Sequence, residues 1–397
     1  MPLGIYISVP FCRTKCSYCN FASDVFSKAV FERYVDRVCA DIAGASNLAQ
    51  ELGTHFEREV DTVYLGGGTP TVLDSAQLRR MFDVVRQQFS VLADAEVTVE
   101  CAPGTLTPEL IECLLGCGVN RVSLGVQSFV DAEAAAVGRL HKRATVREDI
   151  GRLRSAGMAN INVDLIAGLP HQTAESWQES LEQTIATGAP HVSVYMLEVD
   201  EGSRLGRELL AGGTRYHAHY VPDQDTTADF YITACETLET AGIVQYEISN
   251  FARAGFKARH NLKYWTRLPY LGFGVDAHSM LLRGDDGAGA VRFSTPDALE
   301  TYMARPALQA TPVTAAMALE ERFFLGLRLN RGIDLREIGA SFGPATVRNV
   351  RATVDELVSM ALLRRDGDFV RLTASGRLLS NEVFQRFIAL ADCSAIC

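Results

Sequence analysis

Residues 12–21 read CRTKCSYCNF, which places Cys12, Cys16 and Cys19 within eight positions at the spacing C-x3-C-x2-C. This stretch follows the β-branched run IYISV (5–9), which predicts a strand. The cysteines are therefore expected on a loop directly after a strand, where a chain can wrap around a metal centre. Three thiolates on a four-iron cluster would leave one iron open to a small molecule.

Zinc is the alternative occupant of the three thiols. Structural zinc sites usually have four ligands built from paired C-x2-C elements, and no second cysteine pair or nearby histidine completes such a set here. The place where a fourth cysteine would follow holds Phe21. The other seven cysteines are scattered and are expected to behave as small buried hydrophobic residues or to lie in the C-terminal tail: Cys39, Cys101, Cys113, Cys117, Cys235, Cys393 and Cys397.

Six β-branched runs recur along the first half of the chain and alternate with segments of helical spacing. This alternation predicts βαβ units and a parallel sheet, hence an α/β fold. Periodicity alone does not choose between a doubly wound sheet and a partial barrel. The runs are IYISV (5–9), TVYLG (62–66), EVTVE (96–100), RVSLGV (121–126), INVDLI (161–166) and HVSVYML (191–197).

Polar residues fall where several of these strands end. Glu100, Gln127 and Asp164 lie at or just after the ends of three strands, and GGGTP (66–70) directly follows TVYL. Ligands of α/β folds gather at the carboxyl edge of the sheet, so these groups are expected to share one site.

Composition excludes several classes of protein. The 397 residues carry a formal net charge of -10, which argues against a general nucleic-acid binder. No run approaches the roughly 20 apolar residues that span a bilayer. The first residues lack the pattern of a signal peptide. We therefore expect a cytoplasmic protein without a membrane span, whose ten cysteines are thiols or ligands rather than disulfides.

The pattern changes near residue 290, which suggests a first domain at 1–290 and a second at 291–397. VRFSTPDALETYMARP is expected to be a connector that runs into a helix. Three helical segments and a hairpin signal at Asp366-Gly367 then resemble a winged helix. Residues 300–397 hold twelve Arg, no Lys and eleven Asp or Glu, so a packing domain is favoured over DNA binding.

The cysteine spacing, with Tyr18 before the last cysteine, resembles the signature of the radical S-adenosylmethionine (SAM) enzymes. The resemblance implies a partial (β/α)6 barrel and a [4Fe–4S] cluster on Cys12, Cys16 and Cys19. In that family, SAM chelates the fourth iron and is cleaved reductively to methionine and a 5′-deoxyadenosyl radical.

Further positions match the SAM-contacting residues of this family. Gly67, Gly68 and Thr69 correspond to its glycine-rich segment after the second strand. Carboxylates suit an ammonium group or ribose hydroxyls, and an arginine suits a carboxylate. Ala102 departs from the usual E-x-N-P pattern after Glu100, which removes an amide near the SAM site. The resemblance assigns these further side chains to SAM: Tyr6, Phe21, Glu100, Gln127, Arg139 and Asp164.

Within the family, the chain resembles the subgroup of oxygen-independent coproporphyrinogen III oxidase (HemN) and the haem chaperone HemW, almost from end to end. Three features favour the HemW branch. Phe21 replaces the oxidase's fourth cysteine, and only eleven residues precede Cys12, so the oxidase's N-terminal arm is expected to be absent. Residues 260–265 read HNLKYW, which matches the HNxxYW motif linked to haem binding in HemW.

Judged by itself, His260 is more readily a structural histidine at a helix start than a haem ligand. The resemblance favours haem, with His260, Asn261, Tyr264 and Trp265 as its site. It implies a chaperone that passes haem to haem-dependent, respiratory proteins, with peripheral membrane association and a homodimer. The rival is an oxidase of porphyrin biosynthesis. A third interpretation, a DNA-binding regulator, is disfavoured by the nearly neutral C-terminal domain.

Overall fold

The computed structural model describes residues 1–283 and 289–388. Its first six strands lie side by side in chain order, and all five pairings between them are parallel. This order has no reversal, which separates a partial (β/α)6 barrel from a doubly wound sheet. All six predicted strands are confirmed: β1 (Leu3–Val9), β2 (Glu59–Gly67), β3 (Ser90–Cys101), β4 (Arg121–Gln127), β5 (Asn160–Ala167) and β6 (His191–Met196).

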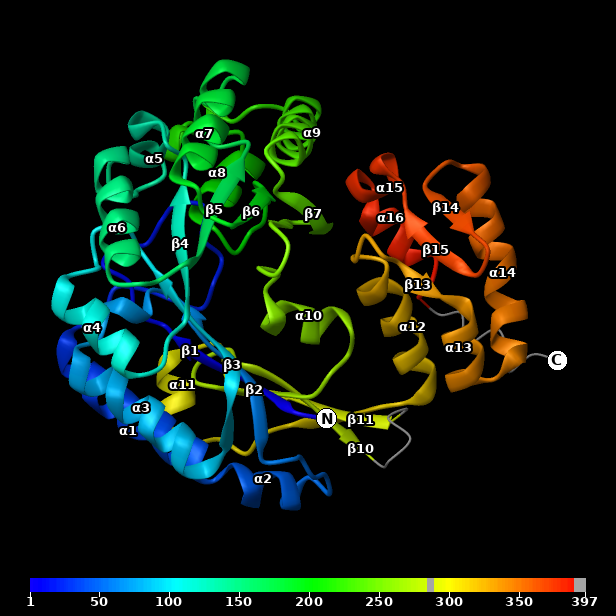
Figure 1. Ribbon diagram of the computed structural model, residues 1–397, viewed down its shortest axis with the longest axis horizontal. Helices are drawn as coiled ribbons and strands as arrows, with labels where there is room; N and C mark the ends of the chain where they lie inside the picture. The colour runs from blue at the N-terminus through cyan, green and yellow to red at the C-terminus, as the bar shows by residue number, and fades with distance from the viewer. Residues whose placement is uncertain (284–288, 389–397) are drawn as a thin grey trace.

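Helices cover the outer face of these strands (Figure 1). Several begin at a side-chain cap, as at Asp74, whose carboxylate accepts from the backbone of Ala76 and Gln77. Apolar residues of the strands, such as Ile7, Leu65 and Val99, pack under this layer. The helices of this part are α1 (Lys28–Ala43), α2 (Ala45–Glu51), α3 (Ser75–Gln88), α4 (Pro108–Gly116), α5 (Asp131–Ala136), α6 (Arg143–Ser155) and α7 (Ala174–Thr187).

The opposite face of the strands forms a polar barrel interior. Register places Ser123, Asn162 and His191 side by side on β4, β5 and β6. Asn162 donates to Ser123 Oγ at 2.7 Å, and its Oδ1 lies 2.6 Å from His191 Nδ1. Buried polar groups need such partners. The strands therefore alternate between an apolar outer face and a polar interior that can hold a polar ligand.

Further strands at both edges extend the sheet to twelve strands. On the β1 side, β9 (Tyr270–Phe273) is followed by β10 (His278–Arg283), β11 (Gly289–Ser294) and β12 (Ala310–Val313), and on the β6 side lie β8 (Asn250–Ala252) and β7 (Val244–Glu247). The first four residues of the expected connector, 291–294, belong to β11, and the expected helix follows as α11 (Leu299–Met303). The pairing of β11 with β10 and β12 explains the difference, because it buries Val291 and Phe293.

Four elements link β6 to β9: α8 (Arg204–Leu210), the 3-10 turn η2 (Arg215–Tyr220), α9 (Gln224–Thr240) and α10 (Arg259–Trp265). In Figure 1, α10 lies between the barrel strands and the C-terminal helices. It therefore contacts both parts of the molecule.

The C-terminal part has its own apolar core around Phe323, Val354 and Phe387. The hairpin signal is confirmed, with Gly367 at φ 59 in the two-residue turn. Helices plus a three-stranded sheet give the expected winged-helix-like arrangement, and the boundary near residue 290 stays a prediction. The elements are α12 (Ala315–Gly326), β13 (Ile333–Asp334), α13 (Leu335–Phe342), α14 (Pro344–Ser359), β14 (Leu363–Asp366), β15 (Phe369–Leu372), α15 (Ala374–Leu378) and α16 (Ser380–Gln385).

Two sequence predictions concern the membrane and the tail. Among the helices of residues 1–283 and 289–388, none combines the length and the apolar character needed to cross a bilayer. Cys393 and Cys397 lie outside the described residues.

Candidate functional site

The three-cysteine loop lies between β1 and α1 and is held by backbone hydrogen bonds. Cys12 donates its N–H to the carbonyl of Asp24 at 3.0 Å, and Ser17 donates to Val137 at 3.1 Å. Cys16 is buried, whereas Cys12 and Cys19 are partly exposed. The loop is thus fixed at both ends while two of its thiols remain accessible.

Donor groups surround the three sulfurs. Arg139 Nη1 lies 3.6 Å from Cys16 Sγ, and Lys15 Nζ lies 3.8 Å from Cys19 Sγ. Burial raises the pKa of the Cys12 thiol, which opposes ionisation. The two cations lie where the negative charge of a cysteine-bound cluster would be.

The donor set fits an iron–sulfur cluster better than a single ion. Within the described part of the chain, no group of three or more Cys, His, Asp or Glu side chains converges closely enough to hold one metal ion. Thiolates that bind different irons of a cluster need not converge on a point. The spacing of the three thiols is therefore compatible with a cluster.

The glycine-rich segment lies directly against the cysteine loop. A side chain at Gly68 would begin 2.7 Å from the carbonyl oxygen of Phe11 and 3.0 Å from Cys12 Sγ. Gly67 has φ 101, which other residues rarely adopt. Thr69 completes the segment, with its hydroxyl 4.0 Å from Cys12 Sγ. Only glycine allows the end of β2 to approach the cysteines this closely.

Glu100 lies at the end of β3 and faces the barrel interior. It accepts hydrogen bonds from the Tyr64 hydroxyl at 2.8 Å and from the Gly67 N–H at 3.1 Å. Burial and the nearby carboxylate of Asp164 raise the pKa of Glu100 to about 7, although the bond from Tyr64 opposes the shift. Near neutral pH this carboxyl group therefore changes charge easily when a cation approaches.

Arg139 and Gln127 meet beside β4. Arg139 follows α5 in a loop and donates to the carbonyl of Gly125, so it is not a solvated helix residue. Gln127 Nε2 and Arg139 Nη2 lie 3.2 and 3.0 Å from the point where a side chain of Gly125 would begin. Arg139 thus connects Cys16 with the end of β4.

Asp164 lies on β5 in the polar network of the barrel. It accepts from Ser123 at 2.9 Å and from Asn162 at 2.7 Å. Burial raises its pKa, while the bonds from its neighbours oppose the shift. Its hydrogen bonds hold the carboxylate in one orientation at the level of Gly125 on β4.

A cavity of about 450 Å³ opens into the barrel interior. Two sets of residues predicted for different ligands line it together. From the SAM set these are Tyr6, Phe21, Gly67 and Glu100, and from the haem set His260, Asn261 and Tyr264. The remaining predicted residues are not among the described side chains that line this cavity.

Helix α10 forms part of the wall of the cavity. Glu96 Oε1 and Oε2 accept from the backbone N–H groups of His260 and Arg259, both at 3.0 Å. Lys263 is buried and pairs with Asp61 at 2.6 Å. A carboxylate at its first turn and an ion pair near its end fix this short helix against β2 and β3.

His260 is buried, and both of its ring nitrogens have partners. Nδ1 lies 2.9 Å from Thr62 Oγ1, and Nε2 lies 2.8 Å from the Tyr264 hydroxyl. Burial, followed by the charges of Lys263 and Arg121, lowers the pKa of His260 to about 3. The imidazole is therefore neutral, and in this arrangement it can bind iron only if one of these hydrogen bonds breaks.

Trp265 lies on a different side of α10 from His260. The guanidinium carbon of Arg328 lies 4.3 Å from the centre of its ring, and its Nε1 is buried without a hydrogen bond among the described residues. Arg328 belongs to the segment that follows α12. The structure therefore places Trp265 at the contact between α10 and the C-terminal part.

Sequence reasoning missed Tyr64 and Tyr195, which also line the cavity. Tyr64 hydrogen-bonds to Glu100, and its ring centre lies 5.3 Å from that of His260. The sequence signal that could have indicated Tyr64 is the alternation of side chains along a strand, because Thr62, Tyr64 and Gly66 share one face of β2. Without the sheet register, that face could not be assigned to the interior.

Comparisons with known proteins agree with this geometry. The radical SAM superfamily model matches residues 6–184, and the HemN C-terminal domain model matches residues 313–379. "Heme chaperone HemW" of Bacillus subtilis is 33% identical, covering 96% of this chain and 98% of the relative. The Escherichia coli protein of the same name is 30% identical, covering 98% of both.

A solved structure also matches. Coproporphyrinogen III oxidase (HemN) from Escherichia coli superimposes with a TM-score of 0.82 at 24% identity, covering 97% of this chain and 90% of that one. At this identity the match shows the shared fold. The chain belongs to the radical SAM superfamily and, within it, to the HemW family.

Proposed function

We propose that this protein is a haem chaperone that holds a [4Fe–4S] cluster, SAM and haem and delivers haem to haem-dependent proteins. The observation that carries the proposal is the shared cavity. Side chains assigned to SAM and side chains of HNLKYW line one space inside the barrel. SAM bound to the first group of side chains would therefore change the environment of haem bound to the second group. A carrier whose haem binding is regulated requires such coupling.

Cys12, Cys16 and Cys19 are the residues that would hold the cluster. When bound, a cluster of this kind supplies an electron for cleavage of SAM, or an open iron that SAM occupies. Gly67 and Gly68 bring the backbone at the end of β2 close to the cysteine loop, where that backbone would contact the methionyl part of SAM. Glu100 offers a buried carboxylate to an ammonium or hydroxyl group, already oriented by Tyr64.

His260 and Tyr264 would serve haem in the same cavity. Their mutual hydrogen bond holds the unliganded motif closed, and release of Tyr264 would free Nε2 of His260 for iron. Asn261 lines the cavity next to them. Trp265 would act indirectly, since it ties α10 to Arg328.

The rival activity is oxidative decarboxylation of coproporphyrinogen III. Phe21 stands where the oxidase carries its additional cysteine, and its side chain is 64% exposed and lines the cavity. A phenyl ring offers apolar contact but no thiol chemistry. This position favours binding over the oxidase reaction.

The proposal places the chaperone in the cytoplasm. The eight cysteines in the described part of the chain are all free, as a reducing compartment favours. Respiratory haem proteins at the membrane are the proposed acceptors, reached by peripheral association, and the homodimer remains part of the proposal.

Anaerobic assays of the reconstituted protein separate the two functions. We expect one haem bound per chain, transfer of that haem to an apo-cytochrome, and no protoporphyrinogen from coproporphyrinogen III. Sustained formation of protoporphyrinogen would overturn the chaperone assignment. Addition of SAM is expected to change the haem transfer rate, because the two sites share one cavity.

A further inference from the structure

A second and larger cavity, of about 620 Å³, lies outside the barrel against the cysteine loop. Its walls come from three segments: the loop at Lys15 and Ser17, the end of α5 at 135–138, and residues 204–220 of α8 and η2. Neither the SAM assignments nor HNLKYW include any of its side chains. The size suits a ligand far larger than a single ion.

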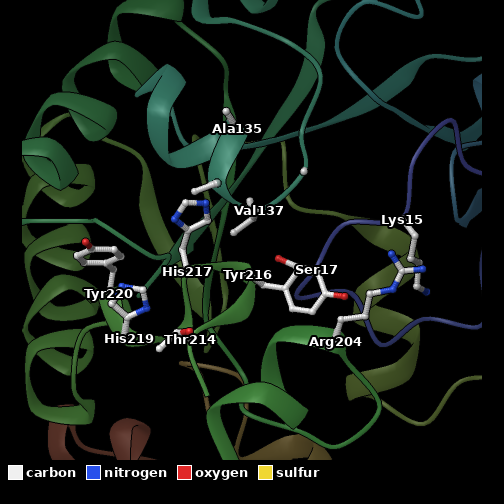
Figure 2. A pocket seen from close by; sticks show the side chains of 12 residues that line it. Lys15, Ser17, Ala135, Val137, Arg204, Thr214, Tyr216, His217, His219 and Tyr220 are labelled. Carbon is white, nitrogen blue, oxygen red and sulfur yellow. The ribbon is translucent and has the colours of Figure 1, made fainter. Parts of the chain in front are cut away.

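The walls of this outer pocket differ in chemistry from one end to the other. Figure 2 shows His217, His219 and Tyr220 at one end and Lys15 and Arg204 at the other, with Tyr216 between them. The ammonium group of Lys15 is already bonded to the carbonyl oxygens of Phe21 and Ser23. Arg204 is exposed and has no hydrogen bond or ion pair within residues 1–283 and 289–388. It is the cation available to a carboxylate.

The imidazole of His217 is held in place by His171. Its Nδ1 lies 3.0 Å from Nε2 of His171, and His171 in turn donates its backbone N–H to the carbonyl of Tyr220 at 2.9 Å. Nε2 of His217 has no partner among the described residues. Metal-ligating histidines usually donate their other ring N–H to a hydrogen-bond acceptor, and with Nδ1 as the donor to His171 the Nε2 of His217 would be free for a metal.

The backbone that presents these rings is unusual. Tyr216 and His217 both adopt left-handed conformations, with φ 54 and φ 59, and so does His171 with φ 68. Side-chain-bearing residues rarely occupy this region, and such outliers cluster at ligand sites. The strained segment turns two aromatic side chains and an imidazole toward one space.

We propose that this outer pocket is a docking site for a tetrapyrrole dicarboxylate of the haem class, separate from the HNLKYW cavity. His217 would ligate the iron, Tyr216 and Tyr220 would contact the porphyrin plane, and Arg204 would pair with a propionate. The inference rests on the proposed haem function and adds a second haem site. Haem would bind in the outer pocket first and then move to the buried HNLKYW motif, or it would be held in the outer pocket alone.

Hydrogen bonds connect the wall of this pocket to the loop that would hold the cluster. Leu205 donates its backbone N–H to Ser17 at 2.8 Å, and Thr14 donates to the carbonyl of Gly138 at 3.0 Å. The loop is therefore part of the wall. Haem in the outer pocket and a cluster on the loop would influence each other's binding through these bonds.

The test is a titration of the full-length protein with haemin, followed by its Soret band. His217→Ala is expected to shift the Soret band and weaken haemin binding about tenfold. Arg204→Glu is expected to weaken both haemin and iron-free protoporphyrin IX, since it acts on the propionate. His55→Ala, an exposed histidine away from both cavities, is the matched control and should bind like the parent.

Three outcomes are distinguishable. Weaker haemin binding by His217→Ala and Arg204→Glu, with normal unfolding temperatures, supports the outer pocket. Normal binding in both, with loss only in His260→Ala, overturns this inference and leaves the proposed function intact. A parent protein that binds no haemin, or binds it without saturation, overturns the proposed function itself.

Discussion

The imidazole Nε2 of His260 lies 2.8 Å from the hydroxyl of Tyr264, four residues along the same short helix. Thr62 of β2 engages the other ring nitrogen at 2.9 Å. The first and fifth residues of HNLKYW are therefore locked to each other and to the barrel. The ring of His260 is also buried, and burial, followed by the charges of Lys263 and Arg121, lowers its pKa.

The buried imidazole of His260 predicts a pH dependence of stability. The pKa of His260 is lowered from 6.5 to about 3 in the folded protein. In the unfolded chain the imidazole takes up a proton near pH 6.5, so the free energy of unfolding should fall as the pH drops below that value. Urea unfolding at pH 7.5 and 5.5 measures this loss.

His260→Asn should reduce that loss, because no proton is then taken up at this position. The buried His191, whose pKa burial also lowers, keeps part of the slope. His278→Asn is the control, since its ring is 66% exposed. An unchanged pH slope in His260→Asn would show that residue 260 is not a buried neutral imidazole.

The cysteine loop predicts a cluster with three protein ligands. Anaerobic reconstitution should give about four irons per chain and a broad visible absorption. Ala at Cys12, Cys16 or Cys19 should abolish both, whereas Cys39→Ala on α1 should retain them. A triple mutant that still holds iron and sulfide in these amounts would contradict the assignment.

Glu100 predicts the charge dependence of SAM binding. Glu100→Gln keeps a hydrogen-bond acceptor for Tyr64 but removes the charge offered to SAM, so affinity should fall tenfold or more, given about 1.5–3 kcal/mol for such a bond. Equilibrium dialysis on the reconstituted protein measures it. The exposed Glu109 provides the control Glu109→Gln, and equal affinities for the two variants would remove Glu100 from the site.

An ion triad, in which Arg267 and Glu321 are buried and Arg292 is partly exposed, joins the segment after α10 to the C-terminal part. Arg267 Nε lies 2.5 Å and Arg292 Nη2 lies 2.6 Å from the two oxygens of Glu321, which is buried. Arg267→Ala should cost about 3–5 kcal/mol of unfolding free energy, because it leaves the carboxylate under-compensated. Urea unfolding of this variant gives the measurement.

The double change Arg267→Met with Glu321→Leu should cost less than Arg267→Ala, since it removes both charges of the pair. A similar cost for the two variants would mean that packing rather than charge holds this contact. The exposed pair of Arg386 and Glu356 serves as a control, where Arg386→Ala should change stability by less than about 1 kcal/mol.

Local sequence determined the order of the elements. The six strands and the helices between them follow from β-branched runs and helical spacing, and Asp366-Gly367 marked the hairpin. The spacing of Cys12, Cys16 and Cys19 indicated the kind of cofactor. These features depend on neighbours within a few residues, so the chain alone carries them.

Tertiary structure decided what faces the interior. Glu96 holds the start of α10 across more than 160 residues, and Trp265 meets Arg328 rather than the cavity. Arg139, which the resemblance assigns to SAM, reaches Cys16. Such pairings arise only when β1–β6 curve and α10 closes the barrel, because sheet register and closure bring together side chains that no local pattern relates.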